Sequence, residues 1–293
     1  MTLAAATRRW HRTAAALALA CLAADCAGRT GAEDTSRDGA AAEAGPASDA
    51  TPPDGATPPD AGAGDAGPWT CDPAAMPLPN EGLIEEPGTG GCPAGMVLVD
   101  AFCIDRFEAS LEGWSPYFNP PGTPPPPARA LRGAVPQAYI SGAQAAAACA
   151  AAGKRLCTDA EWLRACQGPS GNTYPYGDTL MPGICNDARD VHPAVEYFGT
   201  TDPSIWSMLD HPCLDQLPDS LDRSGDNPGC VTAEGVYDLM GNLHEWTADP
   251  AGTFRGGFYV DTVLNGPGCL YATTAHDTAY WDYSTGFRCC ADP

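Results

Sequence analysis

The chain has 293 residues and carries 15 Lys+Arg against 37 Asp+Glu, a formal net charge of −22. Such an acid excess argues against binding to a phosphate backbone, and no run of 18 apolar residues suggests a membrane-spanning helix. Fourteen cysteines would be unusual in a cytosolic enzyme unless they held metal, but the sequence has no CxxC pair and only five histidines. The composition therefore predicts an exported protein with disulfide bonds and no role in nucleic-acid binding.

Residues 1–26 are expected to be an export signal. Arg8, Arg9 and Arg12 precede a run of Ala and Leu at 13–24, which is too short to span a bilayer. Cys21 follows Ala-Leu-Ala, which resembles a lipoprotein cleavage box. Lipidation at Cys21 and ordinary cleavage with soluble release therefore both stay open. The expected location is periplasmic, outer-membrane-anchored or extracellular.

Residues 27–70 predict a disordered tether, because Ala, Gly, Pro, Asp, Ser and Thr dominate this segment. It contains too little apolar surface to offset the conformational entropy lost on folding. A segment at 71–91 is expected to lead into the folded domain at 92–293.

Within 92–293 the predicted elements are short. Residues 96–104 are apolar enough for a buried strand or tight hairpin. Ser141 and Gln144 form a capping box that predicts a helix ending near Gly153, and Thr158 with Glu161 predicts a second helix. A stretch at 168–235 is rich in Pro, Gly and Asp with little periodicity, and regular structure is expected again at 235–246 and 254–260. This pattern indicates an α+β domain with extensive irregular loops.

Several motifs in this region occur in a familiar order: GMVLV at 95–99, FCIDRFE at 102–108, AGKRLCTDAEW at 152–162, YPYG at 174–177, GVYDLMGNLHEW at 235–246, FRGGF at 254–258 and GFRC at 286–289. Together they resemble the formylglycine-generating enzyme (sulfatase-modifying factor) domain family. The resemblance covers nearly all of 92–293 and implies a fold similar to a C-type lectin.

The resemblance also implies structural calcium. Asp238 and Glu245, with the carbonyl groups of Gly241 and Leu243, would supply oxygen ligands of the kind that Ca²⁺ takes. The alternative is that Asn242 and Glu245 only satisfy backbone hydrogen bonds in a tight turn. A second family site would use Asn186 and the carbonyl of Asp187.

Twelve cysteines follow residue 26. The resemblance implies the pairs Cys149–Cys289 and Cys166–Cys269, and Cys92 could pair locally with Cys103. The remaining six have no predicted partner: Cys71, Cys157, Cys185, Cys213, Cys230 and Cys290. The vicinal Cys289 and Cys290 are expected to form separate bridges from opposite faces of one strand.

Members of this family bind Cu(I) through two cysteines after the RGG motif and oxidise a substrate cysteine to formylglycine. In this sequence 256–268 contain no cysteine, and Cys269 matches a structural half-cystine of the family. Tyr259 and Leu264, or Asp261 by another count, stand where the thiolates are expected. Copper is therefore not an expected cofactor.

Two hypotheses compete. The first is a non-catalytic, calcium-supported scaffold that binds a peptide, glycan or protein partner outside the membrane. The second is an active oxidoreductase or other enzyme that reuses the family pocket with different residues. Tyr259, Asp261, His276 and Arg288 are the candidates for such a pocket.

Overall fold

The computed structural model describes residues 69–122 and 124–293. The expected export signal, Cys21 and nearly all of the expected tether lie outside these residues. None of the helices in the described ranges has the length and apolar character needed to cross a lipid bilayer.

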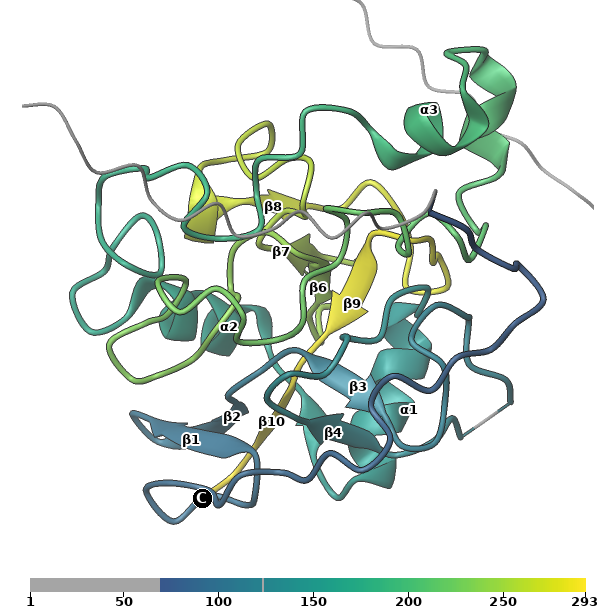
Figure 1. Cartoon of the computed structure of the whole chain (residues 1–293). Coiled ribbons are helices and arrows are strands. Elements are labelled where there is room, and N and C mark those ends of the chain that lie inside the picture. The colour runs from purple at the N-terminus through teal and green to yellow at the C-terminus, as the bar shows by residue number, and fades with distance from the viewer. Residues whose placement is uncertain (1–68, 123) are drawn as a thin grey trace, which may run out of the picture. The chain divides into compact units, whose positions relative to one another are not determined.

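Short strands and helices alternate with long loops, as Figure 1 shows. The strands are β1 (Met96–Val99), β2 (Phe102–Asp105), β3 (Ala109–Leu111), β4 (Ala128–Ala130), β5 (Arg155–Leu156), β6 (His244–Trp246), β7 (Phe254–Arg255), β8 (Ala272–Thr273), β9 (Thr285–Phe287) and β10 (Cys289–Ala291). The helices are α1 (Gly142–Ala151), α2 (Asp159–Gln167) and α3 (Pro193–Phe198), and the 3-10 turns are η1 (Pro203–Ser207) and η2 (Gly268–Leu270).

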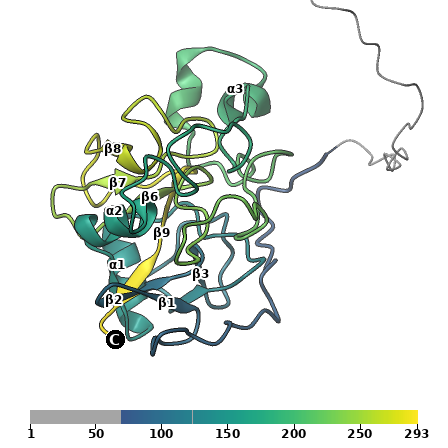
Figure 2. The ribbon, with the colours of Figure 1, turned by 90° about the vertical axis from the view of Figure 1, so that its left-hand side faces the viewer.

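Two four-stranded sheets and one hairpin organise the described residues. The first sheet has the order β1-β2-β10-β5, the second has the order β8-β7-β6-β9, and β3 pairs with β4 alone. β6 runs parallel to β9, and the pairings between neighbours in the first sheet are antiparallel. Because β9 and β10 are separated by Arg288 alone, the C-terminal segment joins the two sheets (Figures 1 and 2).

Both capped helices begin where the sequence predicts. Ser141 accepts a hydrogen bond from the backbone of Gln144, whose side chain accepts one from the backbone of Ser141. Thr158 and Glu161 form the same reciprocal arrangement at the start of α2. These boxes satisfy backbone N–H groups that have no partner inside the first helical turn.

The expected apolar segment at 96–104 is a hairpin, β1 paired with β2. The loop at 168–235 contains α3, which the sequence analysis missed. Its first residue is Pro193, and the His192 side chain accepts a hydrogen bond from Ala194 N. Pro at the first helical position with a side-chain acceptor before it is a helix-start signal, but a helix of six residues has too little periodicity to be recognised.

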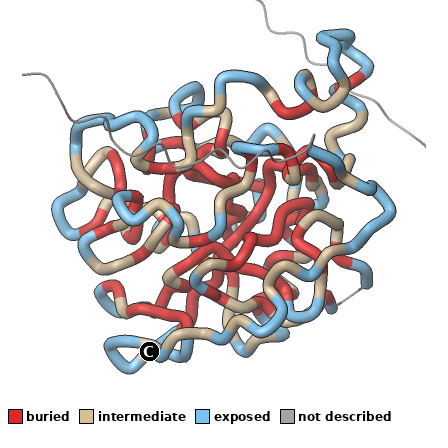
Figure 3. The backbone as a smooth tube through the Cα atoms, in the orientation of Figure 1, coloured by how far each residue is buried: buried red, intermediate tan, exposed pale blue. Residues whose placement is uncertain are grey.

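The core lies between these elements, where buried backbone dominates the centre of Figure 3. Trp162 of α2 packs with Val236 and Leu239 against the first sheet. Trp246 of β6 and Phe287 of β9 pack with α1. The 235–246 turn is thus enclosed by both clusters, which positions its polar side chains inside the domain.

Candidate functional site

A buried ion pair occupies the centre of the domain. Arg288 Nε and Nη2 donate to the two carboxylate oxygens of Glu245 at 2.6 and 2.5 Å, and both side chains are at most 1 % exposed. Trp162 Nε1 also donates to Glu245, at 2.6 Å. The remaining Arg288 donors reach the carbonyl oxygens of Asp105 and Tyr237 at 3.1 and 2.9 Å. Both ions are therefore paired and hydrogen-bonded, as buried charges must be.

Two further carboxylates lie near this pair. Burial, reinforced by the charges of Asp238 and Glu245, raises the pKa of Glu108 well above its usual range. Burial also raises the pKa of Asp238 to about 7, against the lowering effect of the hydrogen bond from Gly225 N at 2.7 Å. Three carboxylates thus share one guanidinium, and burial favours the neutral form of Glu108 and Asp238.

Of the four residues implied as a calcium set, Asp238, Gly241 and Leu243 lie in the turn that leads into β6, and Glu245 lies in β6 itself. However, both carboxylate oxygens of Glu245 accept hydrogen bonds from Arg288, and one of them also accepts a hydrogen bond from Trp162. Neither oxygen is therefore free to bind a metal. Asp238 points one oxygen at Gly225 N. In the described ranges no three His, Cys, Asp or Glu side chains are grouped so that they could hold a metal ion. This donor set does not fit Ca²⁺, because the Arg288 guanidinium already supplies the positive charge.

Asn186 and Asp187 lie at a cavity of about 260 Å³, whose lining also includes Asp219, Asp222, Asn227 and the cationic Arg189. Asn186 is fixed by its side-chain N–H groups, which donate to Ser220 O at 2.6 Å and Asn242 Oδ1 at 3.0 Å. Carboxylate and amide oxygens are suitable donors for Ca²⁺. These oxygens match the chemistry of the ion, but among the described residues the acidic side chains of the cavity are not grouped in threes either, so backbone carbonyl groups or water would have to supply most of the ligands.

Gly241 allows the backbone of the 235–246 turn to approach Asn186, which lines this cavity. Its φ is +76°, and a Cβ there would lie 2.1 Å from Asn186 O. The close approach lets Asn242 N donate to Asn186 O at 2.8 Å. Only glycine combines this backbone conformation with the absence of a side chain.

The stretch that follows β7 has no free thiol. Cys269 is bonded to Cys166, and Tyr259 is fully buried with its hydroxyl donating to Asp215 Oδ1 at 2.9 Å. Asp261 accepts N–H groups of Val263 and Leu264 at 2.9 and 3.0 Å, which makes it a turn residue. Tyr259 and Asp261 thus have structural contacts of their own, whereas Leu264, the other residue at an expected thiolate position, is 83 % exposed.

The four pocket candidates are not brought together. Tyr259 faces Asp215, Asp261 closes a turn and Arg288 is enclosed with Glu245. His276 stacks on Tyr280 at a centroid distance of 3.5 Å. None of the four lines the cavity at Asn186 or the cleft beside the β3–β4 hairpin. Each of the four therefore has separate partners. They do not line either cavity together, so they give no support to the enzyme hypothesis.

All twelve cysteines of the described residues form disulfides. The pairs implied by resemblance are present as Cys149–Cys289 and Cys166–Cys269, and Cys92 is bonded to Cys103. The cysteines without a predicted partner form Cys71–Cys213, Cys157–Cys290 and Cys185–Cys230. Cys71–Cys213 and Cys185–Cys230 join loop segments, and Cys157–Cys290 joins the residue after β5 to β10, the strand with which β5 pairs.

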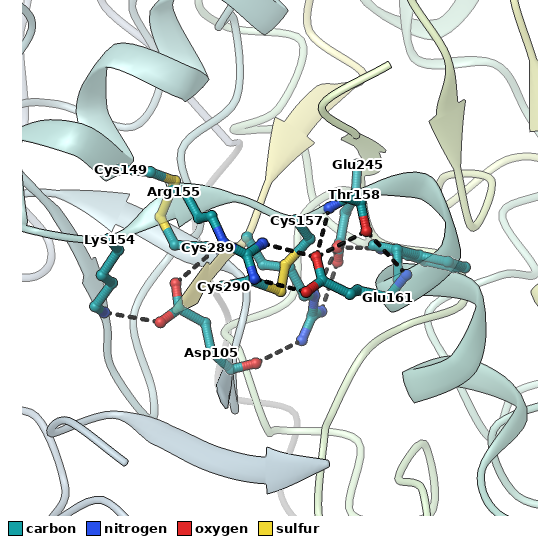
Figure 4. Close-up of a disulfide and its surroundings, with 12 residues drawn as sticks. Asp105, Cys149, Lys154, Arg155, Cys157, Thr158, Glu161, Glu245, Cys289 and Cys290 are labelled. Atoms are coloured by element: carbon teal, nitrogen blue, oxygen red, sulfur yellow. Dashed lines mark hydrogen bonds and ion pairs between the residues drawn. A yellow bond between two sulfur atoms is a disulfide. The ribbon is translucent and has the colours of Figure 1, made fainter. Parts of the chain in front are cut away.

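Figure 4 shows how the two vicinal cysteines tie β10 to the helices. Cys289 is bonded to Cys149 of α1, and Cys290 is bonded to Cys157 before α2. Asp105 accepts Cys289 N at 2.8 Å and the Lys154 ammonium at 2.8 Å. The two disulfides and the contacts of Asp105 thus hold β10 in place beside the helices. Arg288 immediately precedes Cys289 and is positioned by the same contacts.

The sequence matches the family model "Sulfatase-modifying factor enzyme 1-like domain" over residues 80–292. The chain therefore belongs to this family, and the mixture of short helices and strands agrees with the α+β, formylglycine-generating-enzyme-like fold.

Two curated relatives carry the name "Inactive C-alpha-formylglycine-generating enzyme 2". The protein from Mus musculus is 32% identical over 143 residues, which cover 44% of this chain and 39% of the relative. The protein from Bos taurus is 29% identical over 140 residues, covering 44% and 40%. The matched region thus spans about two fifths of the length of these relatives.

Similar solved structures include PvdO from Pseudomonas aeruginosa, at 15% identity and a TM-score of 0.41, covering 66% of this chain and 80% of that one. CarF is similar at 16% identity and a TM-score of 0.40, covering 66% and 86%.

Proposed function

We propose that residues 80–292 form a non-catalytic binding domain of this family, carried on an exported chain. Its partner is a peptide, a glycan or another protein outside the membrane. Six disulfides favour an oxidising compartment, because such bonds are rarely kept in a reducing cytosol.

The observation that carries the proposal is the state of the cysteines. Cu(I) takes soft thiolate ligands, and a cysteine in a disulfide is not a thiolate. Cys269, the only cysteine after the RGG motif and before β9, is bonded to Cys166. The described domain therefore offers no thiolate pair for the copper-dependent oxidation of cysteine. The word "inactive" in the names of the curated relatives is in line with this proposal.

We further propose that calcium supports this scaffold at the cavity lined by Asn186, Asp187, Asp219 and Asp222. A cation there would neutralise carboxylates on loops that contain few regular elements. The bonds from Asn186 and Asn242 then connect the cavity to the 235–246 turn. Binding to the folded state alone would stabilise the domain by mass action.

Copper binding tests the main proposal. The oxidised full chain, with Cys21 and Cys26 changed to serine because they lie outside the described disulfides, is titrated with Cu(I) under anaerobic conditions, and thiolate-to-copper absorption is measured. We expect none, whereas the reduced and unfolded chain should show strong absorption, which makes it the positive control. In parallel, a peptide with a sulfatase-type cysteine is incubated with the protein, copper and oxygen. Stoichiometric copper binding with conversion of the peptide to its aldehyde would overturn the non-catalytic assignment.

A further inference from the structure

We propose that a cleft beside the β3–β4 hairpin binds an apolar α-amino acid as a zwitterion. The cleft has a volume of about 190 Å³ and lies between residues 78–82 and the hairpin. Figure 1 shows the segment that precedes β1 passing along the side of the domain that carries β3 and β4. The cleft is separate from the 235–246 turn and from the cavity at Asn186.

Arg129 of β4 is the first reason. It lines the cleft, and in residues 69–122 and 124–293 it is the one arginine whose guanidinium has neither an ion pair nor a hydrogen bond. In a domain with many carboxylates, an unengaged guanidinium at a cleft is available to a ligand. Its planar N–H donors match a carboxylate in a two-point contact.

The cleft also has an apolar interior. Leu111 and Leu131 are 3 % and 2 % exposed and form part of its lining. Trp114 Nε1 donates to Phe118 O at 3.0 Å, so the polar edge of the indole is already used. One part of its ring packs against the core cluster around α1, and the remaining exposed part offers an apolar surface to a ligand. Small-molecule sites typically combine such apolar walls with a few fixed polar groups.

Two carboxylates at the cleft determine which further charged group the ligand must carry. Glu81 and Glu112 both line the cleft, and neither lies within 4.0 Å ion-pairing distance of Arg129. A ligand with only negative charge would be repelled by them. A ligand with one carboxylate, one ammonium and an apolar side chain would satisfy the guanidinium, the acids and the apolar walls together.

The walls are held in place before any ligand binds. Asn80 exchanges two hydrogen bonds with the backbone of Val135, each 2.8 Å long. Glu85 Oε1 accepts Ala130 N at 2.9 Å. These contacts fasten the segment that contains residues 78–82 to the end of the hairpin. A preformed cleft needs little ordering on binding, which favours affinity for a small ligand.

Calorimetry with the full chain tests this proposal, with L-leucine and L-phenylalanine as probes. Saturable binding is expected for at least one of them. 4-Methylpentanoate lacks the ammonium and 3-methylbutylamine lacks the carboxylate of leucine, so both should bind at least about tenfold more weakly, the effect of losing one charge-assisted contact.

Arg129→Gln should weaken amino-acid binding by about tenfold or more, whereas Arg223→Gln should leave it unchanged. Arg223 is the matched control, because it donates to Gly133 O and does not line the cleft. Circular dichroism and the melting temperature establish that both variants are folded. The proposal is overturned if neither amino acid binds, if Arg129→Gln binds as well as the parent chain, or if 4-methylpentanoate binds as tightly as leucine.

Discussion

Arg288 and Glu245 form a two-point ion pair that is enclosed by the domain, with N–O distances of 2.6 and 2.5 Å. The pair connects the segment between β9 and β10 to β6, although 43 residues separate the two side chains along the chain. The same guanidinium lowers the pKa values of Glu108 and Asp238, which burial raises. Its removal would leave several buried acids without a counter-charge.

Arg288→Met is therefore expected to lower the free energy of unfolding by about 3–5 kcal/mol, the usual cost of leaving one partner of a buried pair unpaired. Arg155→Met is the control, because Arg155 is 39 % exposed in its pair with Glu161 and should cost at most about 1 kcal/mol. Urea denaturation measures both. Equal losses in the two variants would contradict the central role of Arg288.

Asp238→Asn tests whether the domain buries more carboxylates than the one guanidinium can balance. The measured quantity is the pH dependence of the stability difference between the variant and the parent chain. The pKa of Asp238 in the folded domain is raised from 3.8 to about 7. Its contribution to stability is therefore fully present below about pH 4 and is lost as the pH rises through about 7. Asn keeps the hydrogen-bond acceptor without the charge. The variant should gain stability relative to the parent chain by on the order of a few kcal/mol between pH 4 and 8.

Asp202→Asn supplies a contrast of opposite sign. Asp202 is exposed, and the hydrogen bonds from Ser204 lower its pKa. Its contribution is present above the unfolded pKa and is lost as the pH falls. Thermal melts from pH 2 to 8 should show the Asp238→Asn difference changing between about pH 4 and 7, and the Asp202→Asn difference changing with the opposite sign only below about pH 4. A flat difference profile for Asp238→Asn would contradict a raised pKa.

His244→Phe is expected to stabilise the domain. His244 is buried among Phe254, Phe258 and Tyr271, and its Nδ1 has no hydrogen-bond partner within the described ranges. Removing an unsatisfied buried polar atom should gain about 1–3 kcal/mol. Burial, assisted by the charge of His276, lowers the pKa of His244 to about 3. The gain should therefore grow as the pH falls below 6.5, where the unfolded histidine takes up a proton.

His192→Phe is the matched control, because both ring nitrogens of His192 are hydrogen-bonded. Nδ1 accepts Ala194 N at 3.2 Å, and Nε2 lies 2.8 Å from the Tyr283 hydroxyl. This substitution should lower the melting temperature near neutral pH. A lower melting temperature for His244→Phe would contradict the expectation. It would mean that the imidazole of His244 makes a stabilising polar contact, although its surroundings are aromatic.

Calcium at the Asn186 cavity is tested by thermal unfolding with added Ca²⁺ or a chelator. Ca²⁺ should raise the melting temperature of the parent chain, and Asp219→Asn should reduce that shift. Asp219 lines the cavity with a φ of 59°, which Asn also tolerates. Asp226→Asn, which changes the same charge outside the cavity, should retain the full shift. No response to Ca²⁺ in the parent chain would argue against the calcium proposal.

The local elements were predictable because their signals are contained in a few adjacent residues. Ser141 with Gln144 and Thr158 with Glu161 define both capped helices, and the apolar run after Gly95 defines the first hairpin. α3 was missed because its signal is only a proline after His192 in a loop without periodicity.

The site was predictable only in part. The sequence named Arg288 and Glu245 but assigned them to different sites, a pocket and a calcium set. Their ion pair depends on the parallel pairing of β6 with β9, which no local pattern encodes. Arg129 cannot be singled out from the sequence, because an unpaired guanidinium is a property of the neighbours that the fold places around it.

The sequence by itself determined the family and the missing cysteines at 256–268, because both are properties of residue identity and order. Only the tertiary structure decided which cysteine partners Cys71 or Cys290, and that the positive charge beside Glu245 is Arg288. The physical reason is that partner choice depends on distances between segments far apart in the sequence, by 142 residues for Cys71–Cys213 and 43 for Glu245–Arg288. Burial, which sets the pKa values of Glu108 and Asp238, likewise exists only after those segments have packed.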